Sequence, residues 1–561
     1  MASSPISRRT FLSKGAATAG AAAIVGIGGP TMLSACSSSS SGSSSSTSVV
    51  ANPDAGVGMG TPKRGGTAII GTTADIDGFY PASNHWDTNG FLYANTIYDP
   101  LTAVAADGSI QPYLAQSVTP DPEYVNWTLT LRPGVTFSDG SPLDAAVVKA
   151  NFDALASSAL TGTPLQILEG VSVVNDSTVT FTCKTPTVSF PALLTSQAGY
   201  IVGQSMIDGA DDPTPPKPVG TGPFSYANWE PNSSFTATRN PHYWRPGYPY
   251  LDQVTFKPIA DTTQREQTLK TGGVDLIISI DANTIGHFDS LSGYQVVDSL
   301  GDKLGEPDMD FIMLNCLASP TNDLGIRQAL AKAINYPLIQ QTFGGGLAKP
   351  VNGLFPQGSE YWSETGYPTY DPEGAKALVS AYKAQHGTPS LTLTTIPDPR
   401  LIRAVQFIQQ MWQQVGFKVA VSEIEQATLI TNAITGQFQA YTYQQFAAAD
   451  PDLNFYWWSS KTVEKVGGIS LNFARNSDPQ IDAYILQGRE SPDPATRIAA
   501  YQGINERLAA DLPYLWLEQT PWSAVGNSQI QNFANATLPS GQAAKKFDNG
   551  IFFPTQIWMA G

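Results

Sequence analysis

Histidine and cysteine are scarce in this chain, which has four and three of them among 561 residues. The histidines are scattered, and no spacing of Cys and His is typical of a metal site, so we predict no metal and no other cofactor. The sequence also lacks the phosphate-binding patterns GxxxxGKS and GxxxxGKT, the HExxH pattern of zinc hydrolases and the GxSxG nucleophile turn. These absences argue against the enzymes that such patterns mark.

Positive charge is in short supply as well. The chain has 31 Lys and Arg against 47 Asp and Glu, and its formal net charge is −16. A surface with this excess of negative charge argues against binding to nucleic acid and against adsorption to anionic lipid. It suits a folded body that a membrane holds only through an anchor.

Long apolar runs are missing from nearly the whole chain. Only residues 15–35 approach the length of a membrane-spanning helix, but they are rich in Gly and Ala, and Pro30 interrupts them. Because a spanning helix needs about 20 strongly apolar residues, this segment is better explained as part of an export signal. Its layout, a basic head before a weakly apolar stretch and small residues, is typical of such signals.

Two features of the N-terminal segment define how it is exported and held. Arg8 and Arg9, with an apolar pair close behind them, resemble a twin-arginine signal, which carries proteins that fold before export. The sequence LSAC, ending at Cys36, resembles a lipoprotein processing box, so we predict a signal peptide over 1–35 and a lipid on the Cys36 thiol. Residues 36–61 begin with a run of Ser and Gly, and we predict that they form a flexible tether. The predicted location is the outer face of the cytoplasmic membrane.

The two remaining cysteines, Cys183 and Cys316, could pair in an oxidising compartment. However, Cys183 lies in the alternating run VTFTCK, which favours a small core residue of a strand.

The folded part mixes strands and helices. Apolar and polar residues alternate over Val125–Leu131 and Thr178–Lys184, which predicts two half-buried strands. Helical spacing of apolar residues from Leu401 to Val415, with Gly416 as a stop and the runs SLTLTTI and FKVAV on either side, predicts a strand–helix–strand unit. A further helix begins at Asp493-Pro494 and leads to the strand YLWLE. The chain is thus of the α/β class, and it shows no internal repeat.

Several stretches, in order over more than 400 residues, resemble the extracytoplasmic solute-binding proteins of ABC importers, family 5, which includes oligopeptide, dipeptide and nickel binders. The matching stretches are Ile97–Leu101, Asp107-Gly108, Pro112–Ala115, Trp127–Asp153, Pro218–Phe224, Arg239–Trp244, Tyr250–Asp261, Ile326–Leu330, Ala333–Asn335, Asn476–Asp482 and the helix from Asp493. Local chemistry explains part of the pattern, because Gly220 and Gly222 allow a tight turn. We interpret these motifs as marks of the fold and not as the ligand site.

The resemblance implies a two-lobe fold of the type II periplasmic binding protein kind, with an extra subdomain grafted on lobe I. Lobe I would comprise 62–110, 216–300 and 523–561, the grafted subdomain 111–215, and lobe II 301–522, with hinge crossings near 300 and 522. A peptide, or a peptide-like or other polar solute, would be captured between the lobes and delivered to the permease and ATPase subunits of an importer. The protein would act as a monomer and make or break no bond.

The resemblance also points to ligand-binding residues. Peptide-binding members carry an acidic residue three positions before an acid-Pro pair, where it pairs with the peptide amino terminus. The matching position here is Ala447, which argues against capture of a free amine. The residues before it, Tyr443, Gln444, Gln445 and Phe446, are expected to line the cleft and to suit neutral polar ligands. On the facing lobe, Asn84, His85 and Trp86 lie in a loop that reaches the cleft in relatives, although His85 could equally be a surface residue.

Two other functions remain open at this stage. Carboxylates such as Asp450 and Asp452 could serve a membrane-anchored extracytoplasmic hydrolase, although a chain with 47 acidic residues contains such pairs by chance. Alternatively, the protein could bind a solute on behalf of a sensor or act as a chaperone.

Overall fold

The computed structural model describes residues 56–84, 86–158, 161–210, 212, 217–343, 347 and 351–561. All of them belong to one compact unit, Val50–Gly561. Four residues singled out from the sequence, Arg8, Arg9, Cys36 and His85, lie outside the described residues.

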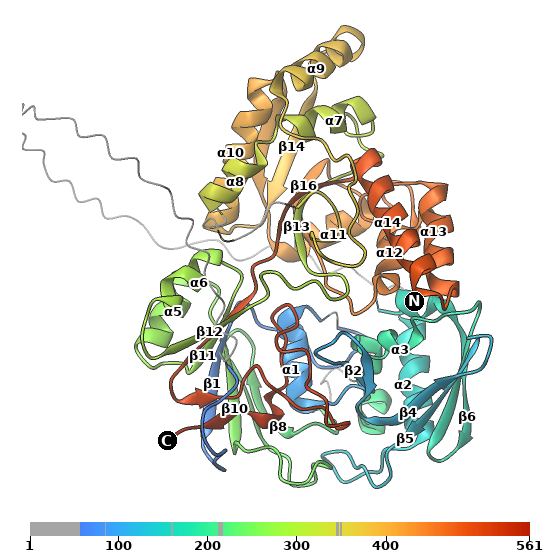
Figure 1. The fold of residues 1–561 in the computed structure, drawn as a ribbon, viewed down its shortest axis with the longest axis vertical. Coiled ribbons are helices and arrows are strands. Elements are labelled where there is room, and N and C mark those ends of the chain that lie inside the picture. The colour runs from blue at the N-terminus through green and yellow to red at the C-terminus, as the bar shows by residue number, and fades with distance from the viewer. Residues whose placement is uncertain are drawn as a thin grey trace, which may run out of the picture. The chain divides into compact units, whose positions relative to one another are not determined.

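A seven-stranded mixed sheet organises the first lobe (Figure 1). Its order is β12-β18-β11-β1-β10-β9-β8. The strands are β1 (Thr67–Thr72), β8 (Phe224–Glu230), β9 (Ser234–Arg239), β10 (Gln253–Pro258), β11 (Leu276–Ser279), β12 (Tyr294–Asp298) and β18 (Ser523–Asn527). The central strand β1 pairs in parallel with β10 and β11, and the remaining pairs are antiparallel.

Both faces of this sheet are covered, because side chains alternate along its strands. On β11, Leu276 and Ile278 join the core around helix α1 (Thr88–Ile97), whereas Ile277 joins a second cluster with residues of α5 (Thr262–Lys270) and α6 (Ala282–Asp289). The two faces therefore bury separate cores.

A four-stranded antiparallel sheet forms the subdomain between the first strands of lobe I. Its order is β4-β5-β7-β6, with β4 (Ala115–Pro120), β5 (Asn126–Leu131), β6 (Leu168–Asn175) and β7 (Thr178–Cys183), and helix α2 (Ala145–Ser157) packs on it. The two strands expected from alternation are confirmed as β5 and β7. Cys183 is buried in this core, and both Cys183 and Cys316 are free thiols.

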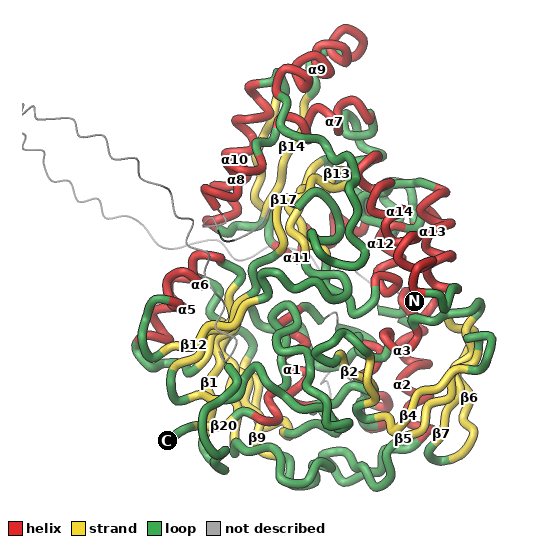
Figure 2. Tube along the Cα trace, viewed as in Figure 1, coloured by secondary structure: helices red, strands yellow, loops and turns green. Residues whose placement is uncertain are grey.

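The second lobe contains a five-stranded mixed sheet of order β15-β14-β16-β13-β17. Its strands are β13 (Met309–Leu314), β14 (Ser390–Thr395), β15 (Lys418–Glu423), β16 (Ala440–Gln445) and β17 (Tyr514–Gln519). The predicted strand–helix–strand unit is confirmed, since β14 and β15 pair in parallel and α10 (Pro399–Gln414) joins them. Figure 2 shows α10 beside these strands.

Helix α10 follows from its sequence. The carboxylate of Asp398 accepts a hydrogen bond from the Leu401 N–H at 2.9 Å, and Pro399 occupies the first turn. Val405, Ile408 and Trp412 lie on one face and are buried. The Trp412 indole donates to the Leu330 carbonyl at 3.0 Å, which fixes α10 against α7 (Leu324–Ala333).

The helix expected at Asp493-Pro494 is also confirmed, as α14 (Pro494–Asp511), and it leads into β17. The other helices are α3 (Phe190–Leu193), α4 (Gln204–Asp208), α8 (Tyr336–Phe343), α9 (Pro372–His386), α11 (Gln426–Thr435), α12 (Phe455–Trp458) and α13 (Pro479–Glu490). Short strands β2 (Thr102–Val104) with β3 (Ile110–Pro112), and β19 (Ile530–Gln531) with β20 (Trp558–Met559), form two small ladders. Five 3-10 turns complete the fold: Thr163–Ile167, Gln197–Gly199, Pro451–Asn454, Ser460–Thr462 and Pro554–Gln556.

Gly220 and Gly222 allow a close approach of two backbone segments. The Gly222 N–H donates to the Ile97 carbonyl at 2.9 Å, and a Cβ at Gly220 would collide with that same carbonyl. A side chain at Gly220 would therefore force this turn away from the end of α1.

The chain passes between the two large sheets twice, from β12 to β13 and from β17 to β18. The two crossings are hydrogen bonded to each other: the Ser299 N–H donates to the Trp522 carbonyl at 2.9 Å, and the Thr520 N–H donates to the Asp308 carbonyl at 3.0 Å. They thus run side by side. Across the described residues, every helix is too short or too polar to span a bilayer.

Candidate site between the lobes

Polar side chains gather at the edge of the second sheet, next to the two crossings. Strand β13 runs antiparallel to both neighbours, so its first residues meet the last residues of β16 and β17. Asp310 lies opposite Gln444 on one side and Glu518 on the other. The register therefore brings together groups that are more than 130 residues apart in the chain.

Of the predicted residues at the end of β16 and directly after it, Tyr443, Gln444 and Phe446 are partly exposed, whereas Gln445 is buried. The Gln444 side-chain amide donates to the Thr520 hydroxyl at 2.9 Å. Tyr443 packs against Trp457, with ring centroids 5.9 Å apart, and Phe446 packs against the same ring at 6.2 Å. Three of the four predicted side chains thus combine aromatic surface and an amide at the sheet edge.

Gln445 points into the protein and faces a buried acid that sequence analysis missed. The side chains of Gln445 and Asn454 lie at the carboxyl group of Glu306 and lower its pKa, but burial dominates and raises that pKa well above the usual value for Glu. The backbones of Glu306 and Ala448 exchange two hydrogen bonds of 2.8 Å. Burial therefore favours the neutral form of the Glu306 carboxyl group. The backbone of Glu306 ties the first crossing to the residues that follow β16.

Asp308 occupies the space next to Ala447. Its carboxylate accepts hydrogen bonds from the Ala447 N–H and, at 2.6 Å, from the Trp522 indole. Burial raises its pKa to about 7, as do the charges of Asp310 and Asp548, and the two hydrogen bonds oppose this. A carboxyl group is thus present beside Ala447, but its side chain is only 2% exposed and is already engaged.

We expect the stability of the protein to fall as pH rises from about 4 to about 7, and to fall less in Asp308→Asn. The pKa of Asp308 is about 7 in the folded state and near 3.9 when unfolded, so the folded state holds the extra proton between these values. This contribution is fully present below the unfolded pKa and is lost as pH passes the folded pKa. Denaturant titrations between pH 4 and pH 8 measure the slope, and the difference should be on the order of a few kcal/mol.

The exposed carboxylate of Asp153 provides the control for this experiment. Asp153→Asn removes an acid that pairs with Lys149 on the surface, and it should leave the pH slope unchanged. Parallel slopes for the wild type and Asp308→Asn would contradict the prediction.

Asp310, Glu518 and Arg400 form a charged cluster beside Asp308. The Arg400 guanidinium lies 3.5 Å from the Glu518 carboxylate, and the Thr520 hydroxyl donates to Asp310 at 2.9 Å. Burial and the neighbouring Asp310 raise the pKa of Glu518 to about 7, and Arg400 opposes this shift. None of these residues carries a local sequence signal, since the register of β13 and β17 brings Asp310 to Glu518 and the first turn of α10 supplies Arg400.

Of the predicted residues of lobe I, Asn84 and Trp86 are engaged within that lobe. Asn84 accepts a hydrogen bond from the Tyr80 N–H at 3.1 Å, and its amide donates to the Asp77 carbonyl at 3.1 Å. Trp86 is 4% exposed and stacks on Tyr98, with centroids 6.0 Å apart. These contacts give Asn84 and Trp86 a structural role in the loop, and their part in ligand binding stays a prediction.

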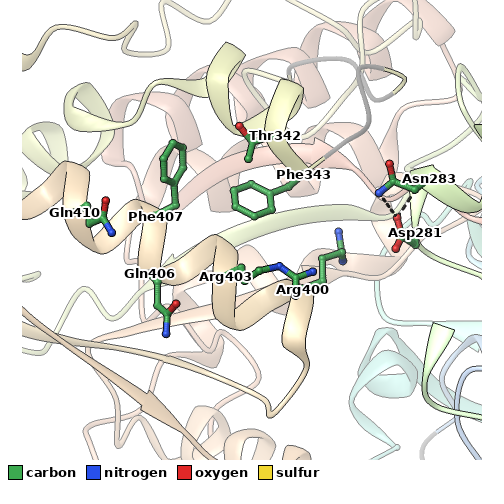
Figure 3. A pocket seen from close by; sticks show the side chains of 9 residues that line it. All are labelled: Asp281, Asn283, Thr342, Phe343, Arg400, Arg403, Gln406, Phe407 and Gln410. Atoms are coloured by element: carbon green, nitrogen blue, oxygen red, sulfur yellow. Dashed lines mark hydrogen bonds between the residues drawn. The ribbon is translucent and has the colours of Figure 1, made fainter. Parts of the chain in front are cut away.

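A cavity of about 360 Å³ opens between the start of α6 in lobe I and helices α8 and α10 in lobe II (Figure 3). Arg400 links it to the charged cluster at the sheet edge. The side chains that line it are Asp281, Asn283, Thr342, Phe343, Arg400, Arg403, Gln406, Phe407 and Gln410. Sequence analysis did not predict these residues, because they come from three separate helices and their loops.

The carboxylates considered for hydrolysis are both held in ion pairs, of which the pair of Asp452 is buried and that of Asp450 is partly buried. Asp452 binds Arg489, with an Nη2–Oδ1 distance of 2.9 Å, and Asp450 binds Arg497. Arg489 also lies over the Phe455 ring. In the part of the chain that the structure describes, no group of three His, Cys, Asp or Glu side chains is arranged to hold a metal ion.

Two α/β lobes joined by paired crossings, with polar side chains and a cavity between them, define a solute-binding protein. The comparisons identify which kind. Residues 109–465 match the family described as bacterial extracellular solute-binding proteins, family 5 Middle. The chain belongs to this family, which confirms the resemblance seen in the sequence.

The curated relatives include the glutathione-binding protein GsiB of Escherichia coli strain K12, which is 24% identical over 447 residues, covering 76% of this chain and 84% of GsiB. Among solved structures, AgaA from A. tumefaciens R10, in complex with agropinic acid, has a TM-score of 0.77 at 23% identity and covers 88% of this chain and 99% of its own. DppA from Helicobacter pylori, in complex with the peptide STSA, has a TM-score of 0.76 at 21% identity and covers 89% and 99%. These structures confirm the two-lobe type II fold.

Proposed function

We propose that this chain captures a peptide, or a peptide-like or other polar solute, between its two lobes and delivers it to the membrane permease of an ABC-type importer. The observation that carries the proposal is the match of residues 109–465 to family 5. The fold agrees with it, because two sheets are connected by two chain crossings. The names of similar proteins, which mention glutathione, agropinic acid and a peptide, agree with small polar ligands.

Capture works through a shift of population. A solute that contacts both lobes does so fully only when they approach each other, so its binding free energy favours the closed form. The permease and its ATPase partner would then recognise the closed surface. No step requires catalysis, and the ion pairs of Asp450 and Asp452 support a non-enzymatic role because both carboxylates are already neutralised.

We assign the lobes as the sequence suggests: 62–110, 216–300 and 523–561 in lobe I, 111–215 as its grafted subdomain, and 301–522 as lobe II. Tyr443, Gln444 and Phe446 are the proposed lobe II ligand residues, because they offer an amide and aromatic surface at the sheet edge. The buried Gln445 would support these residues through its contact with the Glu306 carboxyl group and would not touch the solute itself. The loop with Asn84, His85 and Trp86 is the proposed lobe I contribution.

Export and anchoring complete the proposal. Arg8 and Arg9 would direct twin-arginine export, and Cys36 would carry the lipid that holds the body at the outer face of the membrane. A lipid-anchored monomer needs no spanning helix.

The function is tested by identifying what the purified protein binds. Native mass spectrometry of the protein from its own cells should detect a small solute that denaturation releases. Added free dipeptides, for example Ala-Ala, should bind only weakly in calorimetry, because Ala447 has no carboxylate and Asp308 is buried and engaged. No solute in any preparation, and no stabilisation by a broad solute library, would reject the function, while submicromolar dipeptide binding would reject the ligand restriction.

A further inference from the structure

The cavity between α6, α8 and α10 contains two guanidinium groups on one helix face. Arg400 and Arg403 are three residues apart on α10, so their side chains lie on neighbouring positions of the same face. Figure 3 shows both side chains along the cavity wall that faces Asp281. Two cationic side chains that line one cavity favour a negative group beside them.

Each carboxylate near this pair already has a partner. Asp281 caps α6 by accepting the Asn283 N–H at 3.0 Å, and Asp398 caps α10. Glu518 pairs with Arg400, and Asp310 accepts the Thr520 hydroxyl. These groups therefore balance Arg400 and the helix ends.

Arg403 has no ion-pair partner among these carboxylates. Its side chain is exposed and lines the cavity. Within the described ranges, no ion pair or hydrogen bond of Arg403 to another residue is found, whereas Arg400 has Glu518. The cavity thus offers one guanidinium that forms no ion pair among the described residues, and its planar fork matches the geometry of a carboxylate.

The opposite part of the cavity wall is aromatic. Phe343 of α8 and Phe407 of α10 meet edge to face, with ring centroids 5.9 Å apart, and both are partly exposed. Neutral polar side chains, Thr342, Gln406 and Gln410, surround them. Such a wall fits an apolar or aromatic group of a ligand and provides amides for its polar atoms.

We propose that this cavity binds the carboxylate end of the solute, with Arg403 as the main donor, Arg400 as the second, and Phe343 and Phe407 against the adjoining apolar group. This inference rests on the proposed function and names its ligand class: an organic acid whose carboxylate lies next to an apolar or aromatic group. A carboxylate fits better than a phosphate, because Arg400 already pairs with Glu518 and Asp281 in the same cavity lining repels a second negative charge.

A pair of matched probes tests the proposal. N-acetyl-phenylalanine carries a carboxylate, a blocked amine and an aromatic ring, and N-acetyl-phenylalaninamide differs only by a neutral amide in place of the carboxylate. Calorimetry on the wild type should show the acid binding at least roughly tenfold more tightly than the amide, as expected for a charge-assisted hydrogen bond. Arg403→Gln should remove this preference, and Arg403→Lys, which keeps the charge but not the fork, should retain part of it.

Two controls separate the possible failures. Lys418→Gln removes an exposed cation of β15 outside the cavity and should leave the acid preference unchanged. Equal binding of acid and amide by the wild type, binding of neither, or an unchanged preference in Arg403→Gln would overturn the inference. If a co-purified solute rebinds Arg403→Gln and the wild type equally well, the inference fails while the proposed function stands; if no solute binds at all, the function itself fails.

Discussion

Replacing Asp452 by alanine is expected to lower the free energy of unfolding by about 3–5 kcal/mol, the range for removing one partner of a buried ion pair. The Asp452 carboxylate is 2% exposed and receives two hydrogen bonds from Arg489 Nε, of 3.1 and 3.0 Å, and one from Nη2 of 2.9 Å. The Ser189 hydroxyl adds a further bond of 2.6 Å. Without Asp452, the Arg489 guanidinium would remain buried with no compensating charge.

Chemical denaturation at pH 7 measures this loss. Asp153→Ala provides the matched control, because it removes an aspartate from the exposed Lys149–Asp153 pair, and such pairs contribute about 0–1 kcal/mol. The loss in the free energy of unfolding should therefore be several-fold larger for Asp452→Ala than for Asp153→Ala. A loss below about 1 kcal/mol in Asp452→Ala would show that Arg489 regains water or another partner.

The second large effect concerns the membrane. We expect Cys36→Ser to move nearly all of the protein from the membrane fraction to the soluble fraction, since a serine hydroxyl cannot take the thioether-linked lipid. Each buried CH₂ of an acyl chain contributes about 0.8 kcal/mol, so losing more than one chain removes essentially all binding. Immunoblots of membrane and soluble fractions measure the shift, and mass spectrometry of the released protein measures whether the lipid is absent.

Cys316→Ser is the control for this experiment, because Cys316 is a free thiol in the folded part and lies far along the chain from the processing box. This variant should stay in the membrane fraction. Equal retention of the Cys36→Ser protein would reject the lipid anchor and would favour retention by the uncleaved signal or by the importer.

Elements with a clear period or a clear cap could be predicted from the sequence. Strands β5 and β7 alternate strictly, and α10 combines an Asp-Pro start with apolar residues at helical spacing, so local physics and the tertiary fold agree there. The family resemblance added the two lobes, which no local pattern specifies. Tyr443 and Gln444 were selected through the same resemblance, by their place before Ala447, and their part in ligand binding stays a prediction.

The rest of the site depends on pairings distant in sequence. Asp310 meets Glu518 only because β13 and β17 pair in that register, and Arg403 and Asp281 line the same cavity only because α10 and the start of α6 border it. Trp86 shows how a local prediction can mislead. It belongs to a predicted binding loop, but its ring stacks on Tyr98 inside lobe I, because burying a large aromatic ring is more favourable than leaving it in water.

The paired crossings restrict how the protein can move. Because the backbone at Ser299 is bonded to Trp522 and that at Asp308 to Thr520, neither connection can bend without the other. Twisting or sliding of one half against its counterpart would break these bonds, so we expect rotation about a single axis through both connections to cost the least energy. Every arriving solute then encounters the same two faces in the same relative orientation, and selectivity is set by side chains on those faces and not by a choice among alternative geometries.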